Sequence, residues 1–193
     1  DVVILARHGK KHAIMPTNVP FRANVWALKE QGCTHVLAST ACGSLREEIK
    51  PGHLVLPDQF IDRTTKRAQT FYDKDQVCHI AMEEPFGKRL RKIVEETIRE
   101  LKLPYHTDKT VITIEGPRFS TKAESKLWRQ WGADIVNMST VPEPVLAREA
   151  GMCYQVIAMS TDYDCFMEHN DNVTWEQIVK IMKQNADNVK KIF

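Results

Sequence analysis

Short apolar runs rich in β-branched residues alternate along the chain with longer segments whose apolar positions recur every three or four residues. The first pattern is typical of buried strands, and the second of helices that cover a sheet. Their alternation predicts an α/β fold built in layers. The predicted strands are Val2–Ala6, His35–Thr40, Leu54–Leu56, Thr110–Ile114, Ile135–Met138 and Tyr154–Met159.

The clearest helical pattern lies between Pro85 and Leu101, where apolar residues form one stripe and charged residues fill the remaining positions. Another helix is expected to begin near Thr174, a suitable N-cap, and to carry Ile181 and Val189 on its apolar side. Shorter helices, each followed closely by a glycine that can end it, are predicted at Phe21–Glu30, Lys122–Trp131 and Glu143–Ala150. Because no repeat or low-complexity linker divides the chain, we expect residues 1–193 to form a single domain.

Charge and composition exclude several classes of protein. The 193 residues include 27 basic and 25 acidic side chains that are interleaved, so no basic block suggests a nucleic-acid partner. No signal peptide is recognisable and no apolar run approaches the roughly 20 residues that span a bilayer, so no membrane partner is expected. The five cysteines are odd in number and widely spaced, which indicates free thiols in a reducing compartment. A cytoplasmic location is therefore expected, with the nucleus as an alternative.

Polar residues gather where the predicted strands end. In α/β sheets, ligands bind beyond the carboxyl ends of the strands. Hydroxyls, cations, carboxylates or glycine turns occur at several of these ends. Such repetition is harder to explain by solvated loops than any single occurrence would be. The segments concerned are Arg7–Gly9, Ser39–Ser44, Glu115–Ser120, Asn137–Thr140 and Ser160–Asp164. They predict a polar ligand site at one edge of the sheet.

Each segment taken singly has an ordinary structural alternative. Arg7 and His8 suit a phosphate, to which arginine offers a two-pronged fork, but they could also be a surface pair at a strand end. Thr40 and the small residues after it could bind an anion or form only a tight turn. Asp162 and Asp164 could cap a turn; in extended backbone they would lie about 7 Å apart on one face and could read one edge of a purine. No cluster has metal-ligand spacing, so no metal is expected.

Together these segments resemble the trimeric purine nucleoside phosphorylases, and among them the branch that acts on methylthioadenosine. The resemblance extends along essentially the whole chain. It rests on the motifs RHG with His12, TACGSL, EGPRFS, NMSTVPE and TDYDC, taken in this order. It implies a mixed, twisted central sheet flanked by helices. It also implies phosphorolysis of 5′-methylthioadenosine to adenine and 5-methylthioribose 1-phosphate, a step of purine and methionine salvage.

The roles of the family's residues carry over to matching positions. The residues that would hold phosphate, the co-substrate, are Arg7, His8, Thr40, Ala41 through its backbone, and Ser139. Met138 would lie against the ribose and Phe119 against the purine, although both types are more often core residues. A neighbouring subunit of a homotrimer would contribute His79, which the residues alone would assign to ordinary polar packing. No other cofactor is implied.

The implied chemistry requires an acid from the protein rather than a nucleophile. Phosphate itself stabilises the positive charge that builds on the sugar and then attacks the anomeric carbon. The leaving adenine needs a proton or hydrogen bond at N7, which a carboxylate cannot donate. Asp162 would therefore be protonated when substrate is bound, which means raising a pKa of about 3.9 by about three units, at a cost of roughly 4 kcal/mol. Asp164 would stay ionised and accept from the exocyclic amine.

Base choice and the ends of the chain leave alternatives open. Ser120 and Asp162 stand where the family's 6-oxopurine enzymes carry Glu and Asn, so adenine is expected to be preferred over hypoxanthine. Trp175, in the expected wall of the 5′ pocket, keeps open a broader phosphorylase that accepts adenosine or 6-oxopurine nucleosides. The family's first phosphate loop and last helix are absent before Asp1 and after Phe193, so we expect an incomplete piece of a longer chain. A non-catalytic nucleoside- or phosphate-binding fragment is the third alternative.

Overall fold

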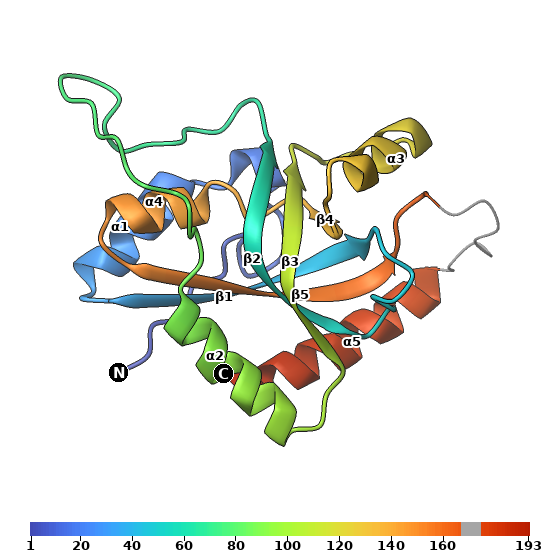
Figure 1. The fold of residues 1–193 in the computed structure, drawn as a ribbon. Coiled ribbons are helices and arrows are strands. Elements are labelled where there is room, and N and C mark those ends of the chain that lie inside the picture. The colour runs from blue at the N-terminus through green and yellow to red at the C-terminus, as the bar shows by residue number, and fades with distance from the viewer. Residues whose placement is uncertain (167–174) are drawn as a thin grey trace.

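The computed structural model describes residues 1–166 and 175–193, and its strands curl into a closed barrel (Figure 1). The strands are β1 (His35–Ser44), β2 (Leu54–Arg63), β3 (Tyr105–Ile114), β4 (Ile135–Asn137) and β5 (Cys153–Tyr163). Their order around the barrel is β1-β4-β3-β2-β5, with β5 pairing again with β1. The pairs β1–β5, β2–β3 and β3–β4 are parallel, whereas β1–β4 and β2–β5 are antiparallel. The predicted α/β fold with a mixed, twisted sheet is confirmed.

Helices cover this sheet on more than one side. They are α1 (Phe21–Glu30), α2 (Lys88–Glu100), α3 (Lys122–Gln130), α4 (Glu143–Glu149) and α5 (Trp175–Ile192), with a 3-10 turn at Pro16–Asn18. In Figure 1, α1 and α4 lie together on one side and α2 and α5 on another, with α3 near the end of β3. The helices begin and end close to the predicted positions; Thr174 and the Trp175 side chain lie outside the described residues. None of the described helices has the length and apolar composition needed to cross a bilayer.

Strand β5 separates two apolar cores because successive side chains of a strand point to opposite faces. Tyr154 and Val156 pack in the core that includes residues of α1 and α4. Ile157, one residue along, packs with residues of α2 and α5. A smaller core containing Leu45 and Trp128 lies under α3. This two-sided burial explains why β5 reads as a nearly continuous apolar run.

The predicted strand at Val2–Ala6 is wrong. Residues 1–6 have no strand conformation, and the side chains of Val2 and Ile4 are 88% and 92% exposed. A strand persists only where a neighbouring backbone completes its hydrogen bonds. The barrel strands already pair with one another around the whole circumference, so within the described residues this segment has no free edge to join.

Strands β1 and β5 continue beyond their apolar runs and carry polar segments into the barrel wall. Their pairing is regular from His35 opposite Cys153 to Cys42 opposite Ser160, after which Gly43 lies opposite Asp162. Thr161 is therefore an extra residue, a β-bulge, on β5. Because side chains alternate along a strand, the extra residue turns Asp162 to the face opposite that of Ser160, where Gly43 lies. The sequence pattern gave no sign of this bulge.

Candidate active site

The predicted carboxyl pair Asp162 and Asp164 meets at Gly43, near the end of β1. A Cβ atom placed on Gly43 would lie 3.7 Å from Oδ2 of Asp162 and 3.5 Å from Cβ of Asp164. The missing side chain therefore leaves both aspartates beside the same stretch of backbone. The N–H of Asp164 also donates to the carbonyl of Ser44 at 2.8 Å, which fixes the second aspartate to β1.

Both aspartates are held toward the neutral form, but not equally. Burial raises the pKa of Asp162, and the charge of Asp164 adds to that rise, while the Thr161 hydroxyl, 2.6 Å from Oδ1, opposes it. Burial also raises the pKa of Asp164, but this rise is opposed by the Ser125 hydroxyl, the Cys165 N–H and the Ser120 hydroxyl. Since Asp164 has more donors around it, a proton shared by the pair is better placed on Asp162.

The donors around Asp164 are not fully used. Within the described part of the chain, Oδ2 of Asp164 and the hydroxyls of Ser120 and Ser125 are buried without a hydrogen bond of ordinary geometry. The two hydroxyls thus act on the carboxyl group from nearby rather than saturating it. Buried polar atoms left in this state carry a free-energy cost that a polar ligand can remove.

A second group forms where the segment after residue 6 meets the turn after β4. His8 donates from Nδ1 to the carbonyl of Ile14 at 2.8 Å, because a carbonyl can only accept. Its Nε2 then accepts from the Ser139 hydroxyl at 3.2 Å. Burial lowers the pKa of His8, with His12, whose ring lies 4.8 Å away, and Arg7 adding to the effect. His8 is thereby held neutral with Nε2 facing Ser139.

Arg7 lies in the same group and is paired with an acid that sequence reasoning did not assign. Its Nε is 2.9 Å from Oε1 of Glu143, and the two side chains are only 13% and 10% exposed. The Tyr154 hydroxyl donates to the other oxygen of Glu143 at 2.6 Å. Burial lowers the pKa of Arg7, but Glu143 and Tyr154 outweigh burial, so the net effect is a raised pKa. Glu143 was visible in the NMSTVPE motif, whereas Tyr154 read only as a core residue of a strand.

Thr40 reaches this region through another residue without an assigned role, Asn137 at the end of β4. Asn137 donates to the hydroxyl of Thr140 at 2.6 Å and, weakly, to that of Thr40 at 3.5 Å. It accepts from the Thr113 hydroxyl at 2.9 Å, which links β3 to the same network. Thr40 itself donates to the carbonyl of Ala41 at 3.0 Å. The network links β1, β3 and β4 next to Ser139.

Two predicted substrate contacts lie outside these groups. Phe119 is 80% exposed, and the neighbouring Arg118 donates two hydrogen bonds of 2.7 Å to the carboxylate of Glu124. His79 is exposed in the stretch 64–87, which has no helix or strand and extends away from the barrel at the upper left of Figure 1. Met138 lies against Gly116, where an added Cβ would approach its sulfur to 2.6 Å and where φ is +70°. Only a glycine fits at this position.

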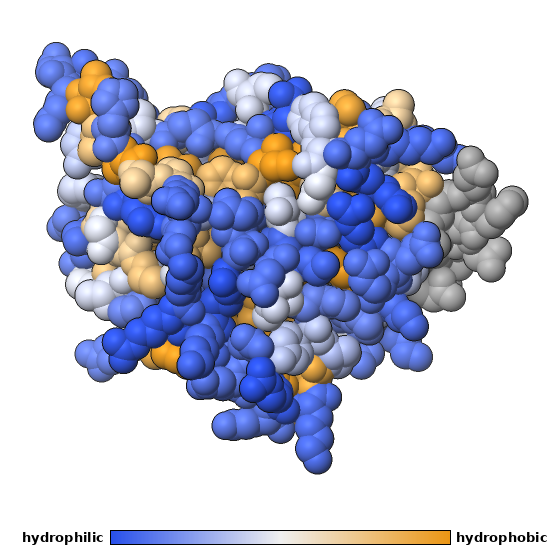
Figure 2. Space-filling model, viewed as in Figure 1, coloured by the Kyte–Doolittle hydropathy of each residue, from blue (hydrophilic) through white to orange (hydrophobic). Residues whose placement is uncertain are grey.

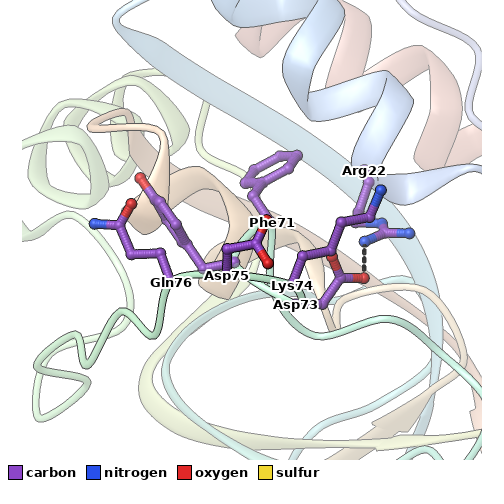
Figure 3. A pocket seen from close by; sticks show the side chains of 7 residues that line it. Arg22, Phe71, Asp73, Lys74, Asp75 and Gln76 are labelled. Atoms are coloured by element: carbon purple, nitrogen blue, oxygen red, sulfur yellow. Dashed lines mark hydrogen bonds and ion pairs between the residues drawn. The ribbon is translucent and has the colours of Figure 1, made fainter.

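Two hollows of the surface lie away from the strand ends. The larger, of about 510 Å³, is lined by Arg22 and by residues 71–76, and Figure 3 shows Arg22 paired with Asp73 across it at 2.5 Å. A hollow of about 300 Å³ lies beside α1. Figure 2 shows an apolar band across the upper half of an otherwise largely polar face. Neither hollow includes a predicted site residue, and we place the site at the strand ends, where acids with shifted pKa values converge.

Among the described residues, no group of three or more His, Cys, Asp or Glu side chains is arranged to hold a metal ion.

Glu115, at the end of β3, ties the stretch after β2 to the barrel. Its carboxylate accepts from the Thr17 hydroxyl at 2.7 Å, from the Lys66 N–H at 2.9 Å and from Arg67 at 3.2 Å, as well as from Thr65. Burial raises the pKa of Glu115, but these donors outweigh burial and lower the pKa from 4.5 to about 2. The folded protein therefore favours the ionised form.

Replacing Glu115 with glutamine should lower the free energy of unfolding at pH 7 by about 1–2 kcal/mol, allowing for partial solvent screening. In the unmodified protein, the contribution of Glu115 is present above pH 4.5 and is lost as the pH falls from there toward about 2. Urea unfolding at several pH values tests both expectations. If the variant loses stability with falling pH as steeply as the original, the carboxylate does not act in this way.

Comparison with known proteins places this geometry in a family context. A family model described as the phosphorylase superfamily matches residues 1–193. S-methyl-5′-thioadenosine phosphorylase of Danio rerio is 59% identical over 197 residues, covering 100% of this chain and 70% of that protein. Methylthioadenosine phosphorylase of Schistosoma mansoni, solved in complex with adenine, has a TM-score of 0.92 and 41% identity, covering 97% of this chain and 72% of that one. A methylthioadenosine phosphorylase from an antarctic soil metagenomic library has a TM-score of 0.94 and 38% identity, covering 97% and 67%.

Proposed function

This chain belongs to the phosphorylase superfamily, and from that premise we propose that it converts 5′-methylthioadenosine and phosphate to adenine and 5-methylthioribose 1-phosphate. The observation that carries the proposal is the pair Asp162 and Asp164 beside Gly43. One neutral and one ionised carboxyl group present a donor and an acceptor, which match N7 and the exocyclic amine of adenine. A 6-oxo group would leave Asp164 facing another acceptor, which is costly.

The reaction needs no group beyond phosphate and these side chains. As the bond between C1′ and N9 breaks, its electron pair moves into the adenine ring, and N7 takes the proton of Asp162. A phosphate oxygen then bonds to C1′, and Asp162 regains a proton from solvent. Arg7, His8, Thr40, the Ala41 backbone and Ser139 are the residues we propose for holding the phosphate. Ribose would lie on Met138 and the base near Phe119 and Ser120.

A homotrimer is part of the same proposal, in which a neighbouring subunit supplies His79 to the 5′ pocket. The exposure of His79 and the reach of residues 64–87 away from their own barrel support such a role (Figure 1). Sedimentation of the protein tests it, because a monomer would remove His79 from the site. The free state of all five cysteines suits the cytoplasmic or nuclear location that we propose.

Release of adenine from 5′-methylthioadenosine, measured with and without phosphate, tests the proposed reaction. We expect release only when phosphate is present, with 5-methylthioribose 1-phosphate formed in equal amount. Inosine serves as the comparison for the choice of base, and adenosine as the comparison for the 5′ group. Release without phosphate would indicate a hydrolase and remove the roles of Arg7 and His8. Cleavage of inosine but not of 5′-methylthioadenosine would contradict the roles of Asp162 and Asp164.

A further inference from the structure

A chain of buried polar side chains lies behind the proposed phosphate residues. Tyr154 on β5 donates to Oε2 of Glu143, the first residue of α4, and Oε1 of Glu143 contacts Nε of Arg7. We propose that Tyr154 is a positioning residue for phosphate, which fixes Glu143 so that Glu143 fixes the guanidinium of Arg7. Tyr154 itself, 2% exposed, would not touch the anion. The inference rests on the proposed function only in that Arg7 binds phosphate.

Glu143 can orient Arg7 only if the carboxylate cannot rotate. Its two oxygens have different partners, a hydroxyl at 2.6 Å and a guanidinium nitrogen at 2.9 Å, so rotation would break both contacts. Contact through Nε leaves the two Nη nitrogens of Arg7 to form the fork that matches a phosphate. The direction of that fork is then set by the carboxylate plane and, one step further, by the Tyr154 hydroxyl.

The tyrosine is suited to this task because it is rigid and remains a donor. Its ring packs in the core near Phe86, with ring centroids 6.1 Å apart, and its backbone belongs to the paired strand β5. Burial, followed by the charge of Glu143, raises the pKa of Tyr154 well above its usual value. The hydroxyl therefore keeps its proton at any pH at which the enzyme would work.

The same contact reaches Ser139, a second proposed phosphate residue. Ser139 lies four residues before Glu143, in the turn between β4 and α4, where the N–H of Glu143 donates to the carbonyl of Thr140 at 3.0 Å. Holding Glu143 against β5 therefore also fixes the turn that presents the Ser139 hydroxyl to His8. One buried hydroxyl thus sets the relative position of a cation and a hydroxyl that are both proposed to hold the anion.

A purely electrostatic role for Glu143 predicts the opposite result from a positioning role. A negative charge close to a bound anion is unfavourable, so Glu143→Gln should tighten phosphate binding if only charge matters. If Glu143 positions Arg7, the amide weakens both contacts, because its oxygen is a neutral acceptor and its NH2 group can meet the Tyr154 hydroxyl only by donating to it. Phosphate should then bind more weakly in spite of the removed charge.

The test measures phosphate affinity without a nucleoside, from the rise in Tm with phosphate concentration, for the original protein and its variants. We expect Tyr154→Phe, which keeps the ring, to weaken phosphate binding about 10-fold or more. Tyr105→Phe, which removes a hydroxyl bonded to Glu95 on the other core, is the matched control and should bind phosphate normally. Glu143→Gln should also bind phosphate more weakly, and it decides the question alone if Tyr154→Phe does not fold.

A second arm asks whether Tyr154 acts through Arg7. In an Arg7→Lys background, removing the hydroxyl should change phosphate affinity much less than in the original protein, because the two residues are coupled. An unchanged affinity in Tyr154→Phe, a tighter affinity in Glu143→Gln, or an equal loss with and without Arg7 would each overturn the inference. If the variants change phosphate affinity as expected but the original protein does not cleave 5′-methylthioadenosine, the inference is supported and the proposed function is rejected. A protein whose Tm ignores phosphate would reject both.

Discussion

Replacing Asp162 with asparagine is expected to lower kcat/KM for 5′-methylthioadenosine about 10²–10⁴-fold, the usual contribution of a general acid. An amide can donate a hydrogen bond to N7 but cannot transfer a proton as the bond to the base breaks. Because the structure places Asp162 beside Gly43 on the bulged end of β5, the asparagine should occupy the same space. The loss should therefore appear mainly in kcat rather than in KM for the nucleoside.

The pH profile gives an independent reading of the same role. Burial raises the pKa of Asp162, so the protonated fraction falls as the pH rises through that raised value. The rate of the original protein should fall with it, and Asp162→Asn should lack that alkaline decline. Asp187→Asn, at an exposed position on α5, is the matched control. Equal rates for Asp162→Asn and the original protein would show that the proton comes from elsewhere.

The preference for one purine base over another should also change when Asp162 is replaced. Asp162→Asn combined with Ser120→Glu presents an amide donor and a second carboxylate, which suit a 6-oxopurine with a protonated N1. We expect the double variant to gain cleavage of inosine while it loses cleavage of 5′-methylthioadenosine. If inosine remains uncleaved, the base is read by groups other than these.

Replacing Arg7 with methionine is expected to abolish detectable use of phosphate and to lower the free energy of unfolding by about 3–5 kcal/mol. The large loss of stability arises because Glu143, 10% exposed, would be left charged and without its cation. The two effects have different causes and can be separated. Urea unfolding reports the loss of stability, and adenine release at high phosphate concentration reports the loss of phosphate use.

The separation comes from a second substitution. Adding Glu143→Gln to Arg7→Met removes the unpaired charge and keeps an acceptor for the Tyr154 hydroxyl, so most of the stability should return. Phosphate use should not return, because the guanidinium is still missing. Recovery of both would mean that Arg7 serves only the fold. Persistent instability of the double variant would mean that the ion pair is not the source of the loss.

The pattern of apolar and polar residues was sufficient to predict most of the helices and strands, because the formation of these elements depends mainly on local sequence. The apolar stripe of α2 and the β-branched run of β5 specify helix and strand wherever the chain folds. Val2–Ala6 has a similar composition, but a strand also needs a partner backbone, which composition does not reveal. The bulge at Thr161 was missed for a related reason, since it exists only in the register between β1 and β5.

The site was predictable to the extent that strand ends collect ligand-binding groups. That rule brought Arg7, His8 and Ser139 to one place and Asp162 and Asp164 to another. The residues behind them were not predictable in the same way. Tyr154 has the composition and spacing of a core residue, and only its 2.6 Å contact with Glu143 distinguishes it. His79 is a different case, because one chain alone does not contain the neighbour that it is proposed to serve.

The bulge at Thr161 makes the effect of a deletion on the base-reading pair depend on which residue is lost. Loss of Thr161 would leave Asp162 directly after Ser160, and regular pairing would still place Asp162 opposite Gly43. That deletion would remove the hydroxyl that lies 2.6 Å from Oδ1 of Asp162. Loss of Tyr163, in contrast, would place Asp164 opposite Ser44 and turn its side chain to the other face of the sheet. During divergence, length changes should therefore be tolerated at Thr161 and rare between the two aspartates.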